Sequence, residues 1–129
     1  MGLLDQIDPR DVKQDVLLVS LAAGGVGVFA GAAVAIATKH RYLLAYSCHN
    51  RSNAAFDPIT LEDQNGNDLV TFGGFQRDSF ILNMPMIVGI PGQNGLQIRN
   101  IGAGAAQNFC AWVQFADLSS QLTKDIFRS

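Results

Sequence analysis

The stretch Asn-Phe-Cys-Ala-Trp-Val-Gln-Phe-Ala-Asp, residues 108–117, has the clearest strand pattern in the chain. Apolar residues occupy every second position in it: Phe109, Ala111, Val113 and Phe115. The positions between them hold Cys110, Trp112, Gln114 and Ala116. Successive side chains of a strand point to opposite faces, so this spacing predicts a β-strand that packs one face against a core.

A second unit, residues 59–72, is expected to be a β-hairpin. Two short runs, Ile59–Glu62 and Asp68–Phe72, flank the pair Asn65-Gly66. An Asn-Gly pair readily takes the positive φ angles of a tight hairpin turn. We therefore predict two antiparallel strands that are joined at this pair.

Further strands are expected along the chain: Asp15–Leu21, Val26–Ala37, Tyr42–His49, Phe80–Leu82, Met86–Ile90 and Leu96–Asn100. The nearly continuous apolar run of Tyr42–His49 suits a central strand. Pro85 and Pro91 flank Met86–Ile90, and because proline lacks an N–H group, that strand should lie at a sheet edge. Seven or eight short strands with Gly, Pro and Asn between them predict an all-β fold, a single β-sandwich or jelly roll.

The composition agrees with one small β domain. The 129 residues are 48% hydrophobic, which is enough apolar material for one core. Thirteen glycines and few helix-forming surface residues favour strands and turns. We expect an N-terminal arm at 1–14, the sandwich at 15–117, and a tail with a short helix at 118–129. Within the arm, Asp8-Pro9 is expected to begin a single helical turn.

The charge of the chain disfavours nucleic acid as a partner. The formal net charge is −2, and the 9 basic residues are spread among 11 acidic ones. No basic stripe is therefore present that would bind a phosphate backbone.

The uncharged segment Val16–Thr38 has two interpretations. It is long enough to span a bilayer as a helix, and small residues recur in it at four-residue spacing: Ala23, Gly27, Gly31 and Ala35. Against a span, Gly24-Gly25 interrupts the segment and equally suits a turn. We favour two strands over a membrane-spanning helix.

Residues that could carry catalysis are few. The chain has one Glu, two His and two Cys. Glu62 and Asp63 are neighbours on the hairpin, where we expect two solvated carboxylates rather than an acid and a base. Cys48 and His49 are consecutive in an expected strand, so their side chains point to opposite faces. We predict that the protein is not an enzyme.

No metal or other cofactor is expected either. A zinc site would need more Cys or His at close spacing. Oxygen-bearing side chains alternate from Asp63 onward, but a calcium loop needs Gly at its sixth position and Glu at its twelfth, where this chain has Asp68 and Gly74. The thiols of Cys48 and Cys110 are expected to pack as small apolar groups rather than to form a disulfide.

Three stretches together resemble a known family. They are Thr38–Tyr46 (TKHRYLLAY), Leu61–Asn67 (LEDQNGN) and Met84–Asn100 (MPMIVGIPGQNGLQIRN). The order of features is an apolar strand, a Pro-Gly-x-x-Gly turn, a strand ending in Arg-Asn, a Gly/Ala loop and a final aromatic strand. This order is similar to that of small β-sandwich virion proteins of bacteriophages, which include the decoration, penton and minor capsid proteins. The resemblance covers roughly residues 38–117. It implies a non-enzymatic structural protein located in the virion, in contact with copies of itself and with a major capsid or shell protein.

The two ends of the chain are the predicted assembly contacts. Each end holds too few apolar residues to fold alone, so burying them requires another surface, either a neighbour or the chain's own sandwich. The candidate residues are Leu3, Leu4, Ile7, Leu122, Ile126 and Phe127.

Two other functions stay open. An exposed aromatic residue such as Tyr46 or Trp112 would serve as the platform of a carbohydrate- or ligand-binding sandwich. If Val16–Thr38 instead crosses lipid, the chain is a small membrane-anchored virion protein.

Overall fold

The computed structural model describes residues 8–32, 38–51, 58–72, 77–102 and 106–119, and nearly all of its regular structure is β-strand. The strands are β1 (Val12–Leu21), β2 (Val26–Val28), β3 (Lys39–Asn50), β4 (Ile59–Asp63), β5 (Asp68–Phe72), β6 (Arg77–Val88), β7 (Leu96–Asn100) and β8 (Gln107–Ser119). Two single-turn 3-10 helices complete the set: η1 (Pro9–Asp11) and η2 (Ala30–Ala32). The predicted all-β fold class is confirmed.

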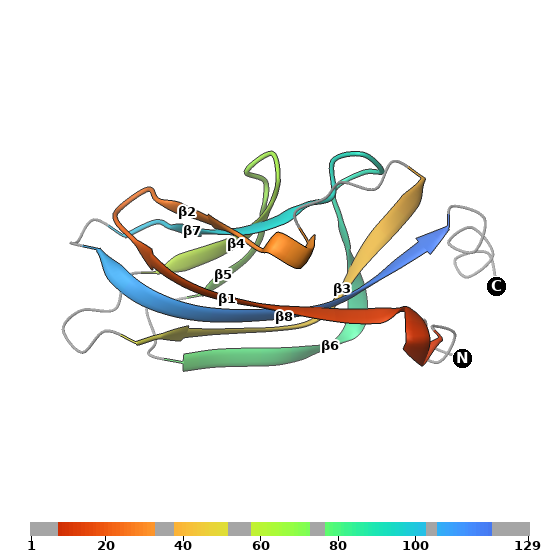
Figure 1. Cartoon of the computed structure of the whole chain (residues 1–129), viewed down its shortest axis with the longest axis horizontal. Helices are drawn as coiled ribbons and strands as arrows, with labels where there is room; N and C mark the ends of the chain where they lie inside the picture. The colour runs from red at the N-terminus through yellow and green to blue at the C-terminus, as the bar shows by residue number, and fades with distance from the viewer. Residues whose placement is uncertain (1–7, 33–37, 52–57, 73–76, 103–105, 120–129) are drawn as a thin grey trace.

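Two four-stranded antiparallel sheets pack face to face (Figure 1). Sheet A has the strand order β1-β8-β3-β6, and sheet B has the order β2-β7-β4-β5. The core between the sheets includes all four alternate residues of the predicted 108–117 strand: Phe109, Ala111, Val113 and Phe115. Tyr42–His49 lies in β3 between β8 and β6, so its predicted central place is also confirmed.

The pair Gly24-Gly25 forms a corner that carries the chain from sheet A to sheet B. Gly24 has a φ of +76°, and the Gly25 N–H donates to the Ala22 carbonyl at 2.8 Å. Asn100 of β7 fixes the corner, because its side-chain amide donates to the Leu21 carbonyl at 3.1 Å. The predicted turn is therefore confirmed. Of the strand expected at Val26–Ala37, only Val26–Val28 is strand, η2 follows, and residues 33–37 lie outside the described ranges.

The membrane interpretation of Val16–Thr38 required a long helix. Among the described residues, no helix has the length and apolar character needed to cross a bilayer.

Both strands that adjoin the predicted arm and tail are longer than expected. β1 begins at Val12 and pairs residues 12–14 with β8, so these residues belong to sheet A and not to an arm. β8 continues through Leu118 to Ser119, where the expected tail would have begun. The remainder of the arm (1–7) and of the tail with its expected helix (120–129) lies outside the described residues.

The helical turn predicted at Asp8-Pro9 is present as η1. The Asp11 N–H donates to the Asp8 carbonyl at 2.8 Å, and the Arg10 N–H donates to the Asp8 carboxylate at 2.9 Å. The Arg10 guanidinium also donates to this carboxylate, which holds the pKa of Asp8 below its usual value. Asp8 thus caps the turn as expected.

The two strands expected on either side of Pro85 are one strand, β6, at the edge of sheet A. Its pairing with β3 is interrupted, because Leu43 pairs with Met86 and Ala45 pairs with Ile81. Pro85 falls in the interrupted part, where its missing N–H costs no ladder hydrogen bond. The edge position was predicted correctly, whereas the separation into two strands was wrong.

The hairpin of β4 and β5 is confirmed, but its turn differs from the prediction. Only Gly66 has a positive φ, of +83°, and Asn65 does not. Instead of a two-residue turn, the Asp63 carboxylate holds a four-residue loop by accepting the N–H groups of Asn65 at 2.8 Å and Asn67 at 3.0 Å. The side chain of Asp63 thus replaces the second positive φ angle that the shorter turn would need.

Candidate interaction surface

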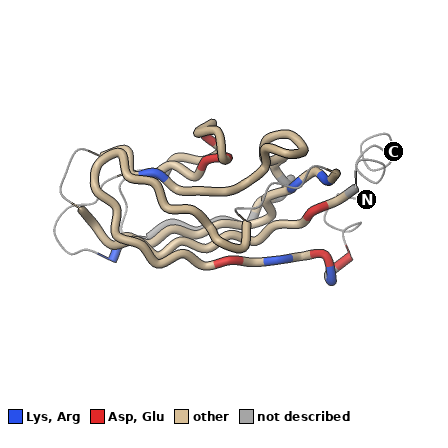
Figure 2. The backbone as a smooth tube through the Cα atoms, turned by 45° about the horizontal axis from the view of Figure 1, so that its top comes forward, with Lys and Arg blue, Asp and Glu red and all other residues tan. Residues whose placement is uncertain are grey.

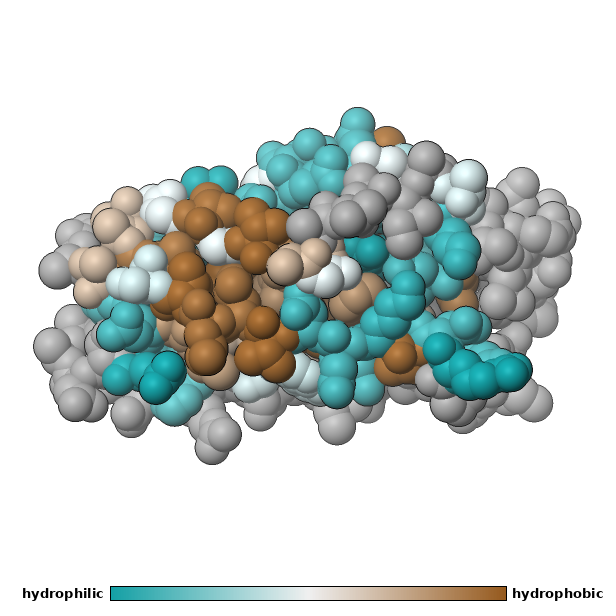
Figure 3. Space-filling model, in the orientation of Figure 1, coloured by the Kyte–Doolittle hydropathy of each residue, from teal (hydrophilic) through white to brown (hydrophobic). Residues whose placement is uncertain are grey.

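One side of the sandwich, formed by β1 and β2, carries an exposed apolar surface. Seven large hydrophobic side chains are exposed among the described residues, and four of them lie on these two strands: Val16 (56%), Leu18 (63%), Val26 (38%) and Val28 (49%). We call these four residues the β1/β2 wall. Figure 3 shows a continuous brown area over β1 and β2. Large exposed apolar patches of this kind mark interaction sites.

The wall exists because β1 and β2 end their sheets on the same side of the sandwich. β1 pairs with β8, and β2 pairs with β7; each is the terminal strand in its sheet order. Along β1, Leu17 and Val19 turn toward the core and are half-buried, while Val16 and Leu18 face outward. Alternation along an edge strand therefore leaves every second apolar residue without a covering layer.

Glycine allows β2 to lie close to β1. A Cβ atom on Gly27 would stand 3.0 Å from Leu17 Cδ2 and 3.1 Å from Val19 Cγ1. Because Gly27 has no side chain, the two strands approach and their outward-facing residues form one surface. Gly27, one of the small residues that resembled a helix–helix interface in the sequence, thus serves the approach of two strands.

Asp15 closes one end of the wall and holds η2 against β1. Its Oδ2 accepts the Gly31 N–H at 2.6 Å, and its Oδ1 accepts the Val16 N–H at 2.9 Å. The carboxylate therefore satisfies one N–H group of an edge strand, a device that discourages pairing with a foreign strand. The surface at this point is suited to side-chain packing rather than to extension of the sheet.

Arg51 lies at the opposite end of the wall. It lines a groove of about 230 Å³ together with Leu18, Val19, Ser20, Asn108 and Phe109. The Arg51 N–H donates to the Asn108 carbonyl at 2.7 Å, and Asn108 pairs with Ser20 across β1 and β8. Figure 2 shows that β1 carries charged residues over its N-terminal half and none over the rest of its length.

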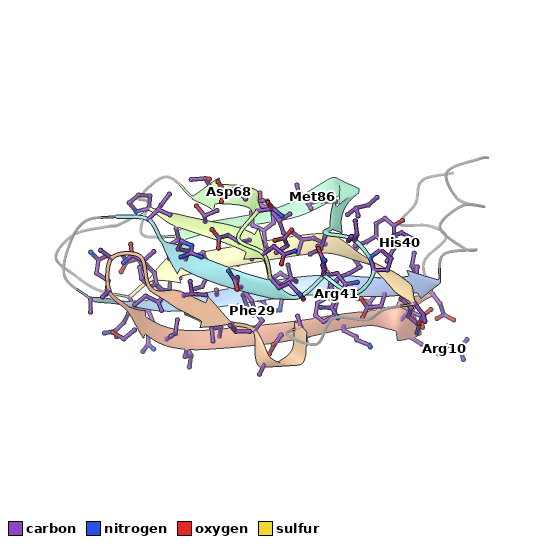
Figure 4. All side chains as sticks on the ribbon, turned by 90° about the horizontal axis from the view of Figure 1, so that it is seen from above. Arg10, Phe29, His40, Arg41, Asp68 and Met86 are labelled. Atoms are coloured by element: carbon purple, nitrogen blue, oxygen red, sulfur yellow. The ribbon has the colours of Figure 1, made fainter. Side chains whose placement is uncertain are left out.

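A buried ion pair positions the elements behind the wall. Arg41 Nε donates to Asp117 Oδ1 at 2.8 Å, and Arg41 Nη1 donates to the carbonyls of Ala32 at 2.7 Å and Asn94 at 2.9 Å. The guanidinium also stands over the Phe115 ring, 4.7 Å from its centroid. Arg41 and the buried Phe29 are labelled in Figure 4. These contacts anchor η2, and the sequence offered no signal for them beyond two charges in strand-like runs.

Of the two aromatic residues considered as a ligand platform, Tyr46 and Trp112, only Trp112 lies on an outer face. Tyr46 is 7% exposed and belongs to the core, so it does not form a surface platform. Trp112 is half-buried on the outer face of sheet A, where it pairs with Val16 of the wall. Its Nε1–H donates to Gln14 Oε1 at 3.3 Å.

The two carboxylates expected to be solvated are both buried. Glu62 and Asp63 are each 3% exposed. Arg99 Nε donates to both oxygens of Glu62 at 3.1 Å, and Asp63 accepts hydrogen bonds from its own loop. The expectation of solvated groups was wrong because the register of β4 against β7 brings Arg99 to Glu62, which a hairpin considered alone does not reveal.

The register of sheet A also places side by side two residues that are far apart in the sequence. His49 of β3 pairs with Cys110 of β8, and both side chains are half-buried. Cys48 points into the core, so the two thiols face opposite sides of sheet A and form no disulfide with each other. Within the described ranges, no group of three or more His, Cys, Asp or Glu side chains is placed to hold a metal ion.

The β1/β2 wall contains none of the residues that the sequence predicted as assembly contacts. Leu3, Leu4, Ile7, Leu122, Ile126 and Phe127 all lie outside the described residues. The β1/β2 wall was missed because the sequence did not indicate which apolar residues of Val16–Thr38 would be covered. The absence of charge over that segment was the available signal.

Comparisons with known proteins return little. No protein-family model matches the chain, and no curated protein matches it. Among solved structures, the chain is similar to a mitogen derived from Yersinia pseudotuberculosis, at 13% sequence identity and a TM-score of 0.37. The match covers 78% of this chain and 84% of the mitogen chain. At that TM-score, the likeness says nothing about what this chain binds or does.

Proposed function

We propose that the chain is a non-enzymatic structural protein of a virus particle, of the decoration, penton or minor capsid class. In this role it acts through repeated contacts with copies of itself and with a shell protein. The β1/β2 wall is the observation that supports the proposal. The order of strands and turns over residues 38–117, which resembles small phage virion proteins, supports the choice of particle.

The wall favours a protein partner for energetic reasons. Burial of apolar surface contributes about 25 cal/mol per Å², and four large side chains at 38–63% exposure leave much of their area in water. A stable contact also needs a rigid surface, because ordering mobile side chains costs free energy on binding. Val16, Leu18, Val26 and Val28 sit on paired strands and three of the four are β-branched, so little further ordering is needed.

The test is incorporation into particles. Particles from the source organism are banded on a density gradient after nuclease and high-salt washing, and the chain is sought by mass spectrometry. The unmodified chain is expected in the particle band. The Leu18→Lys variant, which has a charge at the centre of the wall, should be absent from the particle band. The Ile90→Lys variant should be retained in the band, because Ile90 is similarly exposed (59%) but lies outside β1 and β2.

Recovery of the unmodified chain only from the free protein fractions would contradict the proposal. Equal retention of Leu18→Lys and Ile90→Lys in the particle band would show that the wall is not the contact surface.

A ligand-binding sandwich is the second candidate, favoured by Trp112. Its ring lies on the outer face of sheet A beside Gln14, an arrangement of aromatic and amide groups that suits a sugar. Trp112 is the single tryptophan of the chain, so its fluorescence reports this site alone. Saturable quenching by an oligosaccharide, abolished in Gln14→Ala, would favour this function over the structural one.

A further inference from the structure

We propose that the β1/β2 wall is covered by the same wall of a second copy, in a pair related by a two-fold axis that passes near Leu18. This inference deepens the proposed function by naming the partner, and it uses the same surface. It is carried by the lack of charge among the four wall residues and by the opposite charges at the two ends of the wall. Arg99, the cross-strand neighbour of Val26, has its guanidinium held by Glu62 and by the Gly24 carbonyl.

The lack of charge restricts what can cover the wall. Residues 16–38 contain no Asp, Glu, Lys or Arg. A partner that placed a charge against Val16, Leu18, Val26 or Val28 would lose its hydration without gaining a counter-charge, which is unfavourable. The wall of a second copy meets this requirement, since it is equally apolar and equally uncharged.

The charges at the ends determine the orientation of the two copies. Asp15 adjoins Val16 at one end, and Arg51 lies level with Ser20 at the other, through its hydrogen bond to Asn108. Five positions at about 3.3 Å each separate the two levels along β1. The midpoint falls at Leu17 and Leu18, which is also the middle of the apolar part of β1.

A two-fold axis through that midpoint exchanges the two ends. Arg51 of each copy then stands level with Asp15 of the other, so the symmetric pair gains two opposite-charge contacts. Each Asp15 oxygen accepts one hydrogen bond within its own chain and retains a lone pair for a guanidinium. A parallel arrangement would instead set Arg51 against Arg51 and Asp15 against Asp15, which is repulsive.

The two-fold axis can be tested by cross-linking, because a residue near the axis lies close to its own counterpart. The variant is Leu18→Cys in a Cys110→Ser background. The background change is needed because Leu18 pairs with Cys110 across β1 and β8, and two thiols there could join within one chain. Ile90→Cys in the same background is the matched control, exposed to a similar degree outside the wall.

Diamide serves as the oxidant, accepting two electrons and two protons as two thiols form one disulfide. We expect Leu18→Cys to yield a covalent dimer and the Ile90→Cys control to stay monomeric. Cross-linking of Leu18→Cys no greater than that of the control would overturn the two-fold arrangement.

The charged ends are tested by Arg51→Asp, with association measured by sedimentation equilibrium. Arg51 is exposed and its contact with Asn108 uses the backbone, so the fold should be retained. The variant replaces attraction between residue 51 and Asp15 by repulsion at two symmetric positions. We expect it to weaken association about tenfold or more, and added salt should reduce the difference in association between the variant and the unmodified chain. Unchanged association of Arg51→Asp would overturn the proposed orientation.

Failure of this inference can be distinguished from failure of the proposed function. If the unmodified chain is monomeric and Leu18→Lys is nevertheless lost from particles, the wall binds a different protein and the second copy is wrong. If the chain dimerises through the wall but is absent from particles, the inference holds and the virion function fails.

Discussion

β8 and β1 are neighbours in sheet A and both carry apolar residues on their inward faces, yet these residues have different environments. β8 lies between β1 and β3, and its inward residues Phe109, Val113 and Phe115 are buried between the sheets. β1 is the last strand in its sheet order, so its inward Leu17 and Val19 are only half-buried. Position in the sheet, more than residue type, therefore decides how much of an apolar side chain leaves water.

The difference separates two uses of apolar surface. In β8, apolar contacts are made within the chain and contribute to folding. On the outward side of β1, the same kind of side chain makes few contacts within the chain and is available to a partner. Substitutions in β8 should therefore lower the free energy of unfolding, and substitutions in the wall should change association.

The largest expected effect is that of Phe115→Ala. Phe115 is buried and its ring packs under the Arg41 guanidinium, so the substitution leaves a cavity and removes a cation–π contact. We expect a loss of about 3–5 kcal/mol in the free energy of unfolding, measured by urea denaturation. A loss below about 1 kcal/mol would mean that β8 is not the centre of the core.

A smaller effect is expected for Gly27→Val, at the boundary between core and wall. The new side chain would meet Leu17 and Val19, whose atoms lie 3.0–3.1 Å from an added Cβ. Because those side chains can shift, we expect a loss of about 1–3 kcal/mol. A more stable variant would show that β2 does not approach β1 as closely as described.

The smallest effect on stability is expected for Leu18→Thr. Leu18 is 63% exposed, and threonine keeps a high preference for strands. The unfolding midpoint in urea should correspond to a change within about 0.5 kcal/mol. A loss comparable to that of Phe115→Ala would place Leu18 in a core and remove the distinction between the two strands.

The sequence was sufficient to predict an element where the pattern lay within a single strand or turn. The alternation from Phe109 to Phe115 predicted both the strand and the buried face. Pro85 and Pro91 predicted an edge position for β6, because proline limits ladder hydrogen bonds whatever the rest of the fold is. The Asn65-Gly66 pair predicted a hairpin, although the Asp63 side chain determined which turn was formed.

The sequence was insufficient where the outcome depended on pairing between distant strands. Glu62 is buried because β7 brings Arg99 beside it, and His49 meets Cys110 because of the register between β3 and β8. The wall depends on the corner at Gly24-Gly25, which sends β2 into the other sheet. The periodicity of a single strand contains no information on how that strand pairs with distant ones. Neither the Glu62–Arg99 ion pair nor the exposed β1/β2 wall could therefore be predicted.

The most direct test of the wall as an association surface is sedimentation velocity of the unmodified chain and of Leu18→Lys, combined with thermal unfolding of both. We predict concentration-dependent association for the unmodified chain, a monomer for Leu18→Lys, and closely similar thermal stability of the two as monomers, because Leu18 lies outside the core. Association that persists in Leu18→Lys, or a loss of monomer stability similar to that of Phe115→Ala, would contradict the assignment of this surface to a partner.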